Sequence, residues 1–156
     1  MQEVDIRFEQ DPALEHIEVI LRSANRDAAV EALIRQLEHI MPQKLTVLDY
    51  EGIPSVIDES EIISVASDGK QVRIIAEKGL FTAKQTLQNV EEYLNSRMFL
   101  RISRFELINL DKVAKYDFTI VGTLRIEFEG GMEAWASRRY IPKIREKLSG
   151  EGGYLC

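Results

Sequence analysis

Short stretches of strand character run through most of this chain and restrict its fold more than any other feature. Apolar and polar residues tend to alternate in them, and β-branched and aromatic residues are frequent, as in half-buried strands. The expected strands are residues 45–50, 61–67, 71–77, 80–83, 98–103, 112–116, 123–129 and 132–137. Asp68-Gly69 and Gly130-Gly131 each separate two of these stretches, and such pairs favour tight hairpin turns. With 45% hydrophobic residues, we expect a packed core built mainly from these strands.

Two helices are expected beside the strands, so the predicted fold class is mixed but β-rich. Residues 82–96 have apolar residues at helical spacing, with Thr82 and Gln85 as a capping box. A last helix should begin with Ser137 as its N-cap and continue to Leu148. The side chains expected to face inward are Ala83, Leu87, Val90 and Leu94 in the first helix, and Tyr140, Ile141, Ile144 and Leu148 in the last.

The first third of the chain predicts a separate small unit. Residues 4–9 and 17–23 have strand character, and residues 25–42 have helical periodicity that ends at a proline. Two strands and one helix bury too little apolar surface to be stable alone, so this β-β-α unit should dock on the rest of the chain or on another subunit. Its expected apolar face is Val30, Leu33, Ile34, Leu37 and Met41. The predicted domains are 1–44, 45–148 and a flexible tail, 149–156.

A set of side chains suited to catalysis or metal binding is hard to assemble from this sequence. The two histidines, His16 and His39, lie in the acidic first third, and Cys156 is the last residue, so no nucleophile has a base beside it. Glycine-rich phosphate loops and zinc-ligand spacings are also absent from the sequence. We therefore expect no enzyme activity, no cofactor and no metal.

The sequence favours a cytoplasmic location. It contains no run of 18 apolar residues that could span a membrane, and its first residues, MQEVDIRFEQ, do not resemble a signal peptide. A single cysteine also excludes an internal disulfide framework.

Charge is distributed unevenly along the chain. The net charge is −6, but residues 97–147 contain 11 Lys and Arg against 7 Asp and Glu, whereas residues 1–61 contain 5 against 14. Such asymmetry indicates a basic working surface in the second half, although uneven surface charge alone would give the same counts.

Basic and amide side chains cluster at the breaks between strands, where they could contact phosphates and base edges. Arg138 and Arg139 are notable because they stand in the expected first turn of a helix, where the dipole disfavours cations by about 0.3–1 kcal/mol each. A polyanion bound at that end would offset this cost. The candidate DNA-binding residues are Lys70, Gln71, Arg101, Ser103, Arg104, Asn109, Lys112, Ser137, Arg138 and Arg139.

These stretches, in this order, resemble the LytTR family of bacterial DNA-binding regulators. The resemblance rests on EIISVASDGKQVRI, on the segment from the second helix through RISRFELIN, and on TLRIEFEGGMEAWASRRY with its Ser-Arg-x-Tyr motif. It implies an elongated β-β-β domain with short helices at its side, whose loops enter successive major grooves of duplex DNA. It further implies that Arg138 and Arg104 read bases and that Lys70 or Gln71 approaches from a hairpin tip. Arg139, Arg101 and Lys112 would mainly contact phosphates.

The sequence departs from the family pattern in two places. Where the family commonly has His-Arg-Ser-Tyr, this chain has Ser103-Arg104-Phe105-Glu106, which replaces an imidazole and adds an acid. The segment before the domain, 1–44, is too short for the receiver domain that many members carry. We therefore expect a stand-alone regulator whose activity depends on abundance, on a protein partner or on oligomerisation.

The leading interpretation is a transcription regulator that binds double-stranded DNA as a homodimer on repeated half-sites, with the N-terminal unit as the dimer contact. The alternative is a protein–protein interaction module of LytTR-like fold with weak or no DNA binding, which Glu106 and the acidic first third favour. A small enzyme is a third and weaker alternative.

Overall fold

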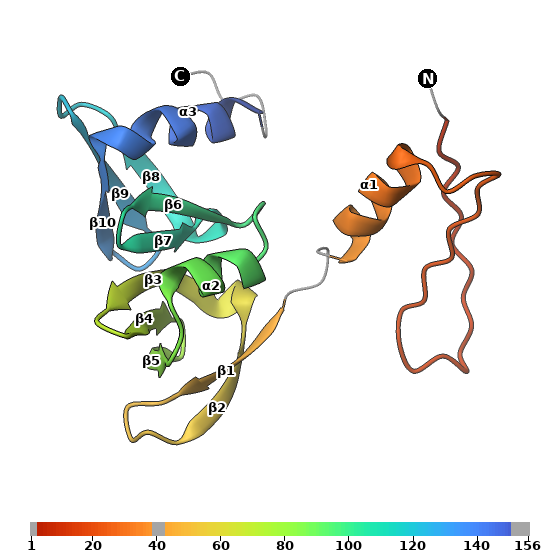
Figure 1. Cartoon of the computed structure of the whole chain (residues 1–156), viewed down its shortest axis with the longest axis horizontal. Coiled ribbons are helices and arrows are strands. Elements are labelled where there is room, and N and C mark those ends of the chain that lie inside the picture. The colour runs from red at the N-terminus through yellow and green to blue at the C-terminus, as the bar shows by residue number, and fades with distance from the viewer. Residues whose placement is uncertain (1–2, 39–42, 151–156) are drawn as a thin grey trace. The chain divides into compact units, whose positions relative to one another are not determined.

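The computed structural model describes residues 3–38 and 43–150, and it divides the chain into two units, Met1–Leu37 and Glu38–Cys156 (Figure 1). Each unit is described by itself below. Within the described ranges, no helix is both long and apolar enough to cross a membrane.

The first unit contains one helix, α1 (Ala28–Glu38). Asp27 caps it: its Oδ1 accepts a hydrogen bond from the Val30 N–H at 3.0 Å, and its carbonyl accepts one from the Glu31 N–H at 3.0 Å. Met41, which was expected on the apolar face, lies outside the described residues. The other four expected residues of that face are half-buried.

The two strands expected at residues 4–9 and 17–23 are not formed, and this prediction was wrong. Residues 3–27 contain turns and bends but neither helix nor strand. Their apolar side chains are open to solvent, with Ile6 87% and Phe8 88% exposed. A strand needs a neighbour for its backbone hydrogen bonds and a core for its apolar face, and this unit supplies neither.

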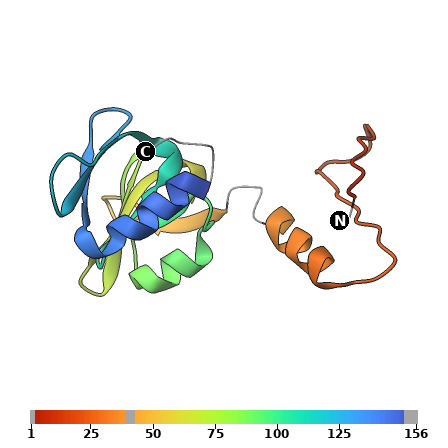
Figure 2. The ribbon, with the colours of Figure 1, turned by 90° about the horizontal axis from the view of Figure 1, so that it is seen from above.

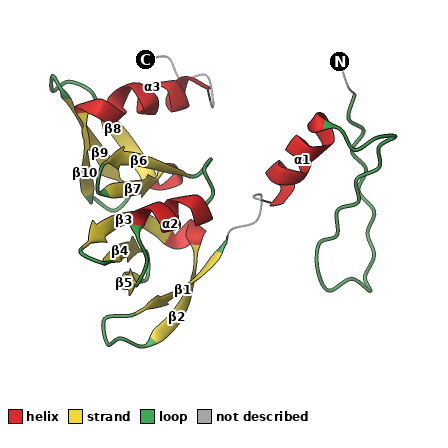
Figure 3. Ribbon diagram, viewed as in Figure 1, coloured by secondary structure: helices red, strands yellow, loops and turns green. Residues whose placement is uncertain are grey.

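The second unit is a succession of strands with two α-helices and three short 3₁₀ turns (Figure 3). Its strands are β1 (Lys44–Leu48), β2 (Pro54–Asp58), β3 (Ile62–Asp68), β4 (Gln71–Ala76), β5 (Gly79–Ala83), β6 (Phe99–Ser103), β7 (Glu106–Asn109), β8 (Val113–Asp117), β9 (Thr123–Phe128) and β10 (Glu133–Ser137). Its helices are α2 (Leu87–Tyr93) and α3 (Ile141–Gly150), and its 3₁₀ turns are η1 (Glu59–Glu61), η2 (Leu110–Lys112) and η3 (Arg138–Tyr140).

The strands form two sheets with antiparallel pairing throughout. The first has the order β2-β1-β5-β4-β3-β7-β6, and the second has the order β10-β9-β8. Both predicted hairpins are confirmed: the residue after β3 is Gly69, and Gly130 and Gly131 join β9 to β10 with φ of +94° and +95°. The β-rich mixed fold predicted from the sequence is confirmed as well.

Two hydrophobic cores support the second unit. The first is built on β1 to β5 and is covered by Leu87 and Val90 of α2 and by Leu94, which follows the helix. The second lies between the three-stranded sheet and the β6–β7 hairpin and includes Ile144 of α3. The β6–β7 hairpin contributes to both, because Phe99 and Leu107 belong to the first core while Leu100, Ile102 and Ile108 belong to the second. Figure 2 shows α2 and α3 from above.

Both helices of the second unit begin later than expected. α2 is capped by Thr86, whose Oγ1 accepts the Asn89 N–H at 3.1 Å; Thr82 and Ala83 instead end β5. Ser137 ends β10 without a capping hydrogen bond, and α3 starts only at Ile141. α3 also continues through Gly150, two residues into the predicted tail, whose remaining residues lie outside the described part.

Candidate nucleic-acid interface

Two hairpin turns lie side by side at one end of the seven-stranded sheet. Gly69 and Lys70 form the β3–β4 turn, between the paired residues Asp68 and Gln71. Arg104 and Phe105 form the β6–β7 turn. A hydrogen bond of 2.8 Å from the Ser67 N–H to the Phe105 carbonyl links the two. Lys70 and Arg104 are therefore displayed from neighbouring turns, and both side chains are exposed.

The β6–β7 turn is held by side chains of its own hairpin. Ser103 Oγ accepts a hydrogen bond from the Phe105 N–H at 3.2 Å, which stabilises the turn locally. The Arg104 guanidinium carbon lies 5.8 Å from the centre of the exposed Phe105 ring. Ser103 thus supports the turn, and Arg104 projects from it.

Arg101 is occupied by contacts within the protein. Its Nε donates to Glu91 Oε2 of α2 at 2.9 Å, and its Nη1 donates to the Arg104 carbonyl at 2.8 Å. Only 22% of its side chain is exposed. The sequence suggested a phosphate contact for Arg101, whereas the structure places it between a helix and the turn.

A third basic group stands where β10 passes into η3. Arg138 and Arg139 are both exposed and lie in the 3₁₀ turn that precedes α3. The Arg138 guanidinium lies against the backbone of Gly122 in the β8–β9 loop, since a Cβ on Gly122 would be only 2.5 Å from Arg138 Nη2 and 3.1 Å from Nε. Gly122 has φ of +80°, a conformation that favours glycine.

The three groups lie along one side of the second unit. Figure 1 shows the β3–β4 turn, the β6–β7 turn and the β10–α3 junction at the left of the second unit. Lys70, Arg104 and Arg138 belong to these three backbone segments, and we call this side of the second unit the basic side.

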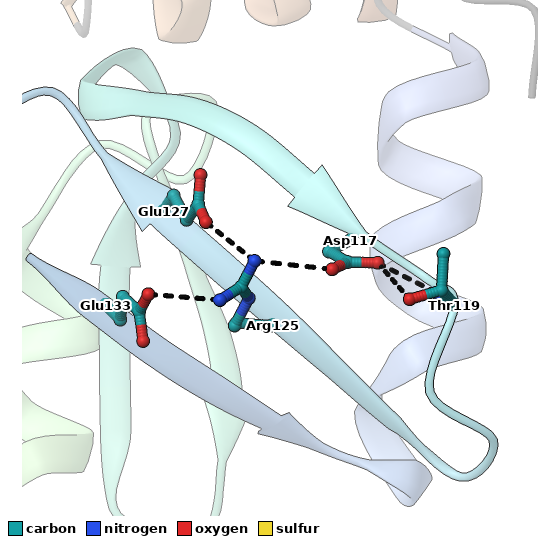
Figure 4. A network of polar contacts seen from close by, with 5 residues as sticks. All are labelled: Asp117, Thr119, Arg125, Glu127 and Glu133. Atoms are coloured by element: carbon teal, nitrogen blue, oxygen red, sulfur yellow. Dashed lines mark hydrogen bonds and ion pairs between the residues drawn. The ribbon is translucent and has the colours of Figure 1, made fainter. Parts of the chain in front are cut away.

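Two further cations of the basic half, Arg125 and Lys112, are paired with neighbouring carboxylates. Arg125 on β9 forms ion pairs with Glu127 at 2.8 Å, Glu133 at 3.2 Å and Asp117 at 3.5 Å (Figure 4). Hydrogen bonds from Thr119 and, to a lesser extent, the charge of Arg125 lower the pKa of Asp117. Lys112 is half-buried and paired with Glu77.

The cations of the basic side differ from these. Within residues 3–38 and 43–150, no ion pair involves Lys70, Arg104, Arg138 or Arg139. Their charge is therefore available to an external anion, whereas that of Arg125 is already balanced.

The structure corrects the assignment of Asn109 as a DNA contact. This residue ends β7 and is fully buried, with 0% exposure. Its Nδ2 donates to the Ile62 carbonyl at 2.8 Å, and its Oδ1 accepts from the Asp111 N–H at 2.9 Å. A buried amide with both ends bonded joins β3 to the 3₁₀ turn and leaves nothing for a ligand.

Glu106, the acid that departs from the family pattern, is half-buried beside the β6–β7 turn. Burial raises the pKa of its carboxyl, and a hydrogen bond with Ser64 and the charge of Arg73 oppose the rise. Arg73 therefore offsets part of the negative charge that Glu106 brings to the basic side.

Two residues that matter for this surface were not identified from the sequence. Glu91 is one of these residues, because nothing in the sequence indicates that Arg101 reaches it. Gly122 lies in a loop without a motif, and only its contact with Arg138 reveals its role. The described residues contain no group of three or more His, Cys, Asp or Glu that could hold a metal ion.

Comparison with known proteins finds a matching DNA-binding domain family, similar transcriptional regulators and a similar solved domain. The model of the LytTr DNA-binding domain matches residues 55–149. Two uncharacterised HTH-type transcriptional regulators of Staphylococcus aureus, from strains NCTC 8325 and MRSA252, are 30% and 29% identical over 94 residues. The match covers 60% of this chain and 63% of each relative, so it spans less than two thirds of their length. A solved LytTr DNA-binding domain from Bacillus cereus shares the fold, with a TM-score of 0.62, 23% identity and coverage of 67% of this chain and 95% of that one.

Proposed function

The chain belongs to the LytTR family of DNA-binding domains, and on that basis we propose that it is a sequence-specific transcription regulator that reads duplex DNA with its basic side. The family is one of DNA-binding regulators and not of enzymes. Such a regulator acts in the cytoplasm, where the DNA is. Residues 45–148 would form its DNA-binding domain.

The observation that carries this proposal is a set of exposed cations without an intramolecular ion pair. They lie on two hairpin turns and at the β10–α3 junction, all on the basic side: Lys70, Arg104, Arg138 and Arg139. Arginine forms bidentate hydrogen bonds with guanine in the major groove, and projections spaced along one side can enter successive grooves. We assign base reading to Arg104 and Arg138, an approach from the hairpin tip to Lys70 or Gln71, and phosphate contact to Arg139, with Ser137 beside it.

We revise the proposed roles of two residues. Lys112 is paired with Glu77, and Arg101 with Glu91. If either cation bound a DNA phosphate instead, its carboxylate, Glu77 or Glu91, would be left unpaired beside the polyanion, which would be electrostatically unfavourable. We therefore assign Arg101, Ser103 and Lys112 to support of the domain, as Asn109 already is.

We further propose that the N-terminal unit, 1–44, forms a homodimer contact. Its support is the exposure of apolar side chains on residues of strand-like pattern, among them Ile6, Phe8 and Ile17. Apolar surface of this kind on a regulator is typical of a protein–protein interaction site. A dimer would place two DNA-binding domains on repeated half-sites, and its formation or a second protein partner would set the activity.

The experiment is a gel-shift and anisotropy titration of the full-length chain against duplex DNA from upstream of its own gene, repeated from 50 to about 200 mM salt. We expect affinity to fall steeply with salt, since each neutralised phosphate contributes a slope of about −0.9. Binding that is flat with salt, or equal for upstream and scrambled DNA, contradicts the proposal. Absence of any shift supports the protein–protein interaction module.

A further inference from the structure

We propose that Glu91 and Arg101 form a positioning pair that orients the β6–β7 turn so that Arg104 can read a base. This inference deepens the proposed function and rests on it. It assigns a role in sequence discrimination to a helix residue, Glu91, that itself projects no charge from the basic side.

The contacts form a continuous path from α2 to the turn. Glu91 Oε2 accepts from Arg101 Nε at 2.9 Å, and Arg101 Nη1 donates to the carbonyl of Arg104 at 2.8 Å. The planar guanidinium thus uses two of its donors on two different elements, which a lysine ammonium cannot do in the same fixed geometry. The Arg101 side chain is only 22% exposed, so water competes weakly for these donors.

The helix end of this path is rigid. α2 is fixed by Leu87 and Val90, which are buried in the first core, and by the Thr86 cap. At the other end of the path, Arg101 holds the backbone carbonyl of Arg104, the residue whose exposed side chain is proposed to read a base. Holding that carbonyl fixes the peptide plane that follows Arg104, and with it the direction in which the Arg104 side chain leaves the turn.

A base reader requires this kind of support. Arg104 is exposed, and its guanidinium carbon lies 5.8 Å from the centre of the Phe105 ring. A long side chain on a loose turn loses conformational entropy on binding, and it samples geometries that do not match the bidentate edge of guanine. The positioning pair removes part of that freedom before DNA arrives.

The rival assignment, Arg101 as a phosphate contact, makes opposite predictions. If Arg101 bound a phosphate, removal of Glu91 would release it and strengthen binding to every sequence. If Arg101 positions the turn, removal of Glu91 weakens discrimination although it removes a negative charge. The selected-to-scrambled affinity ratio therefore separates the two assignments: removal of Glu91 leaves it unchanged if Arg101 binds a phosphate and lowers it if Arg101 positions the turn.

The matched control is Glu92, the next residue of α2. It is exposed, carries the same charge and accepts a hydrogen bond from Gln88 Nε2 at 3.4 Å. Glu91→Ala and Glu92→Ala therefore change the net charge and the helix propensity equally. Only Glu91→Ala removes the partner of Arg101.

The probes are the duplex that the wild-type full-length protein selects from a randomised library and a scrambled duplex of the same composition. We expect Glu92→Ala to leave the selected-to-scrambled affinity ratio unchanged. We expect Glu91→Ala to lower that ratio at least about fivefold, the lower range for one arginine–guanine pair. Arg101→Lys keeps the charge and should lower the ratio similarly, with the salt slope of scrambled DNA unchanged.

A double-mutant cycle with Arg104→Ala tests whether Glu91 acts through the turn. In the Arg104→Ala background, Glu91→Ala should cause no further loss of discrimination. Circular dichroism and thermal melting identify variants that fail to fold, and the milder Glu91→Gln then replaces Glu91→Ala. An unchanged ratio in a folded Glu91 variant, or an equal loss with Glu92→Ala, overturns the inference. A wild-type protein that selects no sequence overturns the proposed function instead.

Discussion

Gly122→Ala is expected to displace the Arg138 guanidinium, and so to abolish its proposed base contact, while the arginine itself is kept. A Cβ on Gly122 would lie 2.5 Å from Arg138 Nη2, which is closer than non-bonded atoms allow, and 3.1 Å from Nε, which is tighter than most such contacts. The atoms in its way belong to the free end of a flexible side chain, so the guanidinium moves and the loop stays. If Arg138 reads a base, its displacement should lower the affinity ratio between selected and scrambled duplexes by about 5- to 150-fold, the equivalent of 1–3 kcal/mol.

The substitution also strains the backbone, and this second effect needs its own control. Gly122 has φ of +80°, where a side chain costs roughly 1–2 kcal/mol of stability. Gly52, in the β1–β2 turn, has φ of +79° and no atom within 4 Å of its would-be Cβ. Gly52→Ala therefore reproduces the strain without touching Arg138.

The assay is competition anisotropy with both duplexes, together with urea unfolding of each variant. Both alanine variants should lose similar stability, and only Gly122→Ala should lose discrimination. In an Arg138→Ala background, Gly122→Ala should have no further effect on the affinity ratio. The reasoning is refuted if Gly122→Ala discriminates as well as wild type, or if Gly52→Ala discriminates as poorly.

Further outcomes can be checked on the full-length chain. Asn109→Ala should lower the free energy of unfolding by about 1–3 kcal/mol for the buried Ile62 carbonyl that it leaves unbonded, and by less for the part-buried Asp111 N–H; urea unfolding with an unchanged midpoint would contradict this. Phe8→Asp should shift sedimentation from dimer to monomer, and an unaltered dimer would exclude this region as the contact. Folding raises the pKa of Glu106 above its ordinary value of 4.5. The ionised carboxyl therefore destabilises the fold as pH rises from 4.5 through the higher pKa of the folded state. Glu106→Gln should therefore melt at a higher temperature at pH 7, and the difference should shrink towards pH 4.5; a difference that is constant with pH would count against the burial of this charge.

Hairpins were the part of the fold that local sequence predicted best. Asp68-Gly69 and Gly130-Gly131 combine a residue able to adopt positive φ with strand-like neighbours, and both determinants act within a few residues. β2 and β7 were missed. β7 is only four residues long, and three of them are buried, so it lacks the alternation that marks a half-exposed strand.

The errors at the N-terminus and at the site have a common physical cause. Residues 4–9 alternate like a strand, yet a strand forms only where a partner supplies hydrogen bonds. Arg101 and Lys112 carry charges suited to DNA, yet Glu91 and Glu77 approach them from distant parts of the sequence. Composition indicated which residues are cationic, and only the tertiary structure distinguished the paired cations from the unpaired ones.

The β6–β7 hairpin supplies side chains to both hydrophobic cores, and this couples the stability of one sheet to that of the other. Loss of either core would remove packing partners from the hairpin and so destabilise the other core. The second unit should therefore denature in one cooperative transition. Amide protons of β6 and β7 should then exchange with solvent only through global opening. The turn that displays Arg104 would then be anchored in the slowest-exchanging segment of the domain, where local opening is rare.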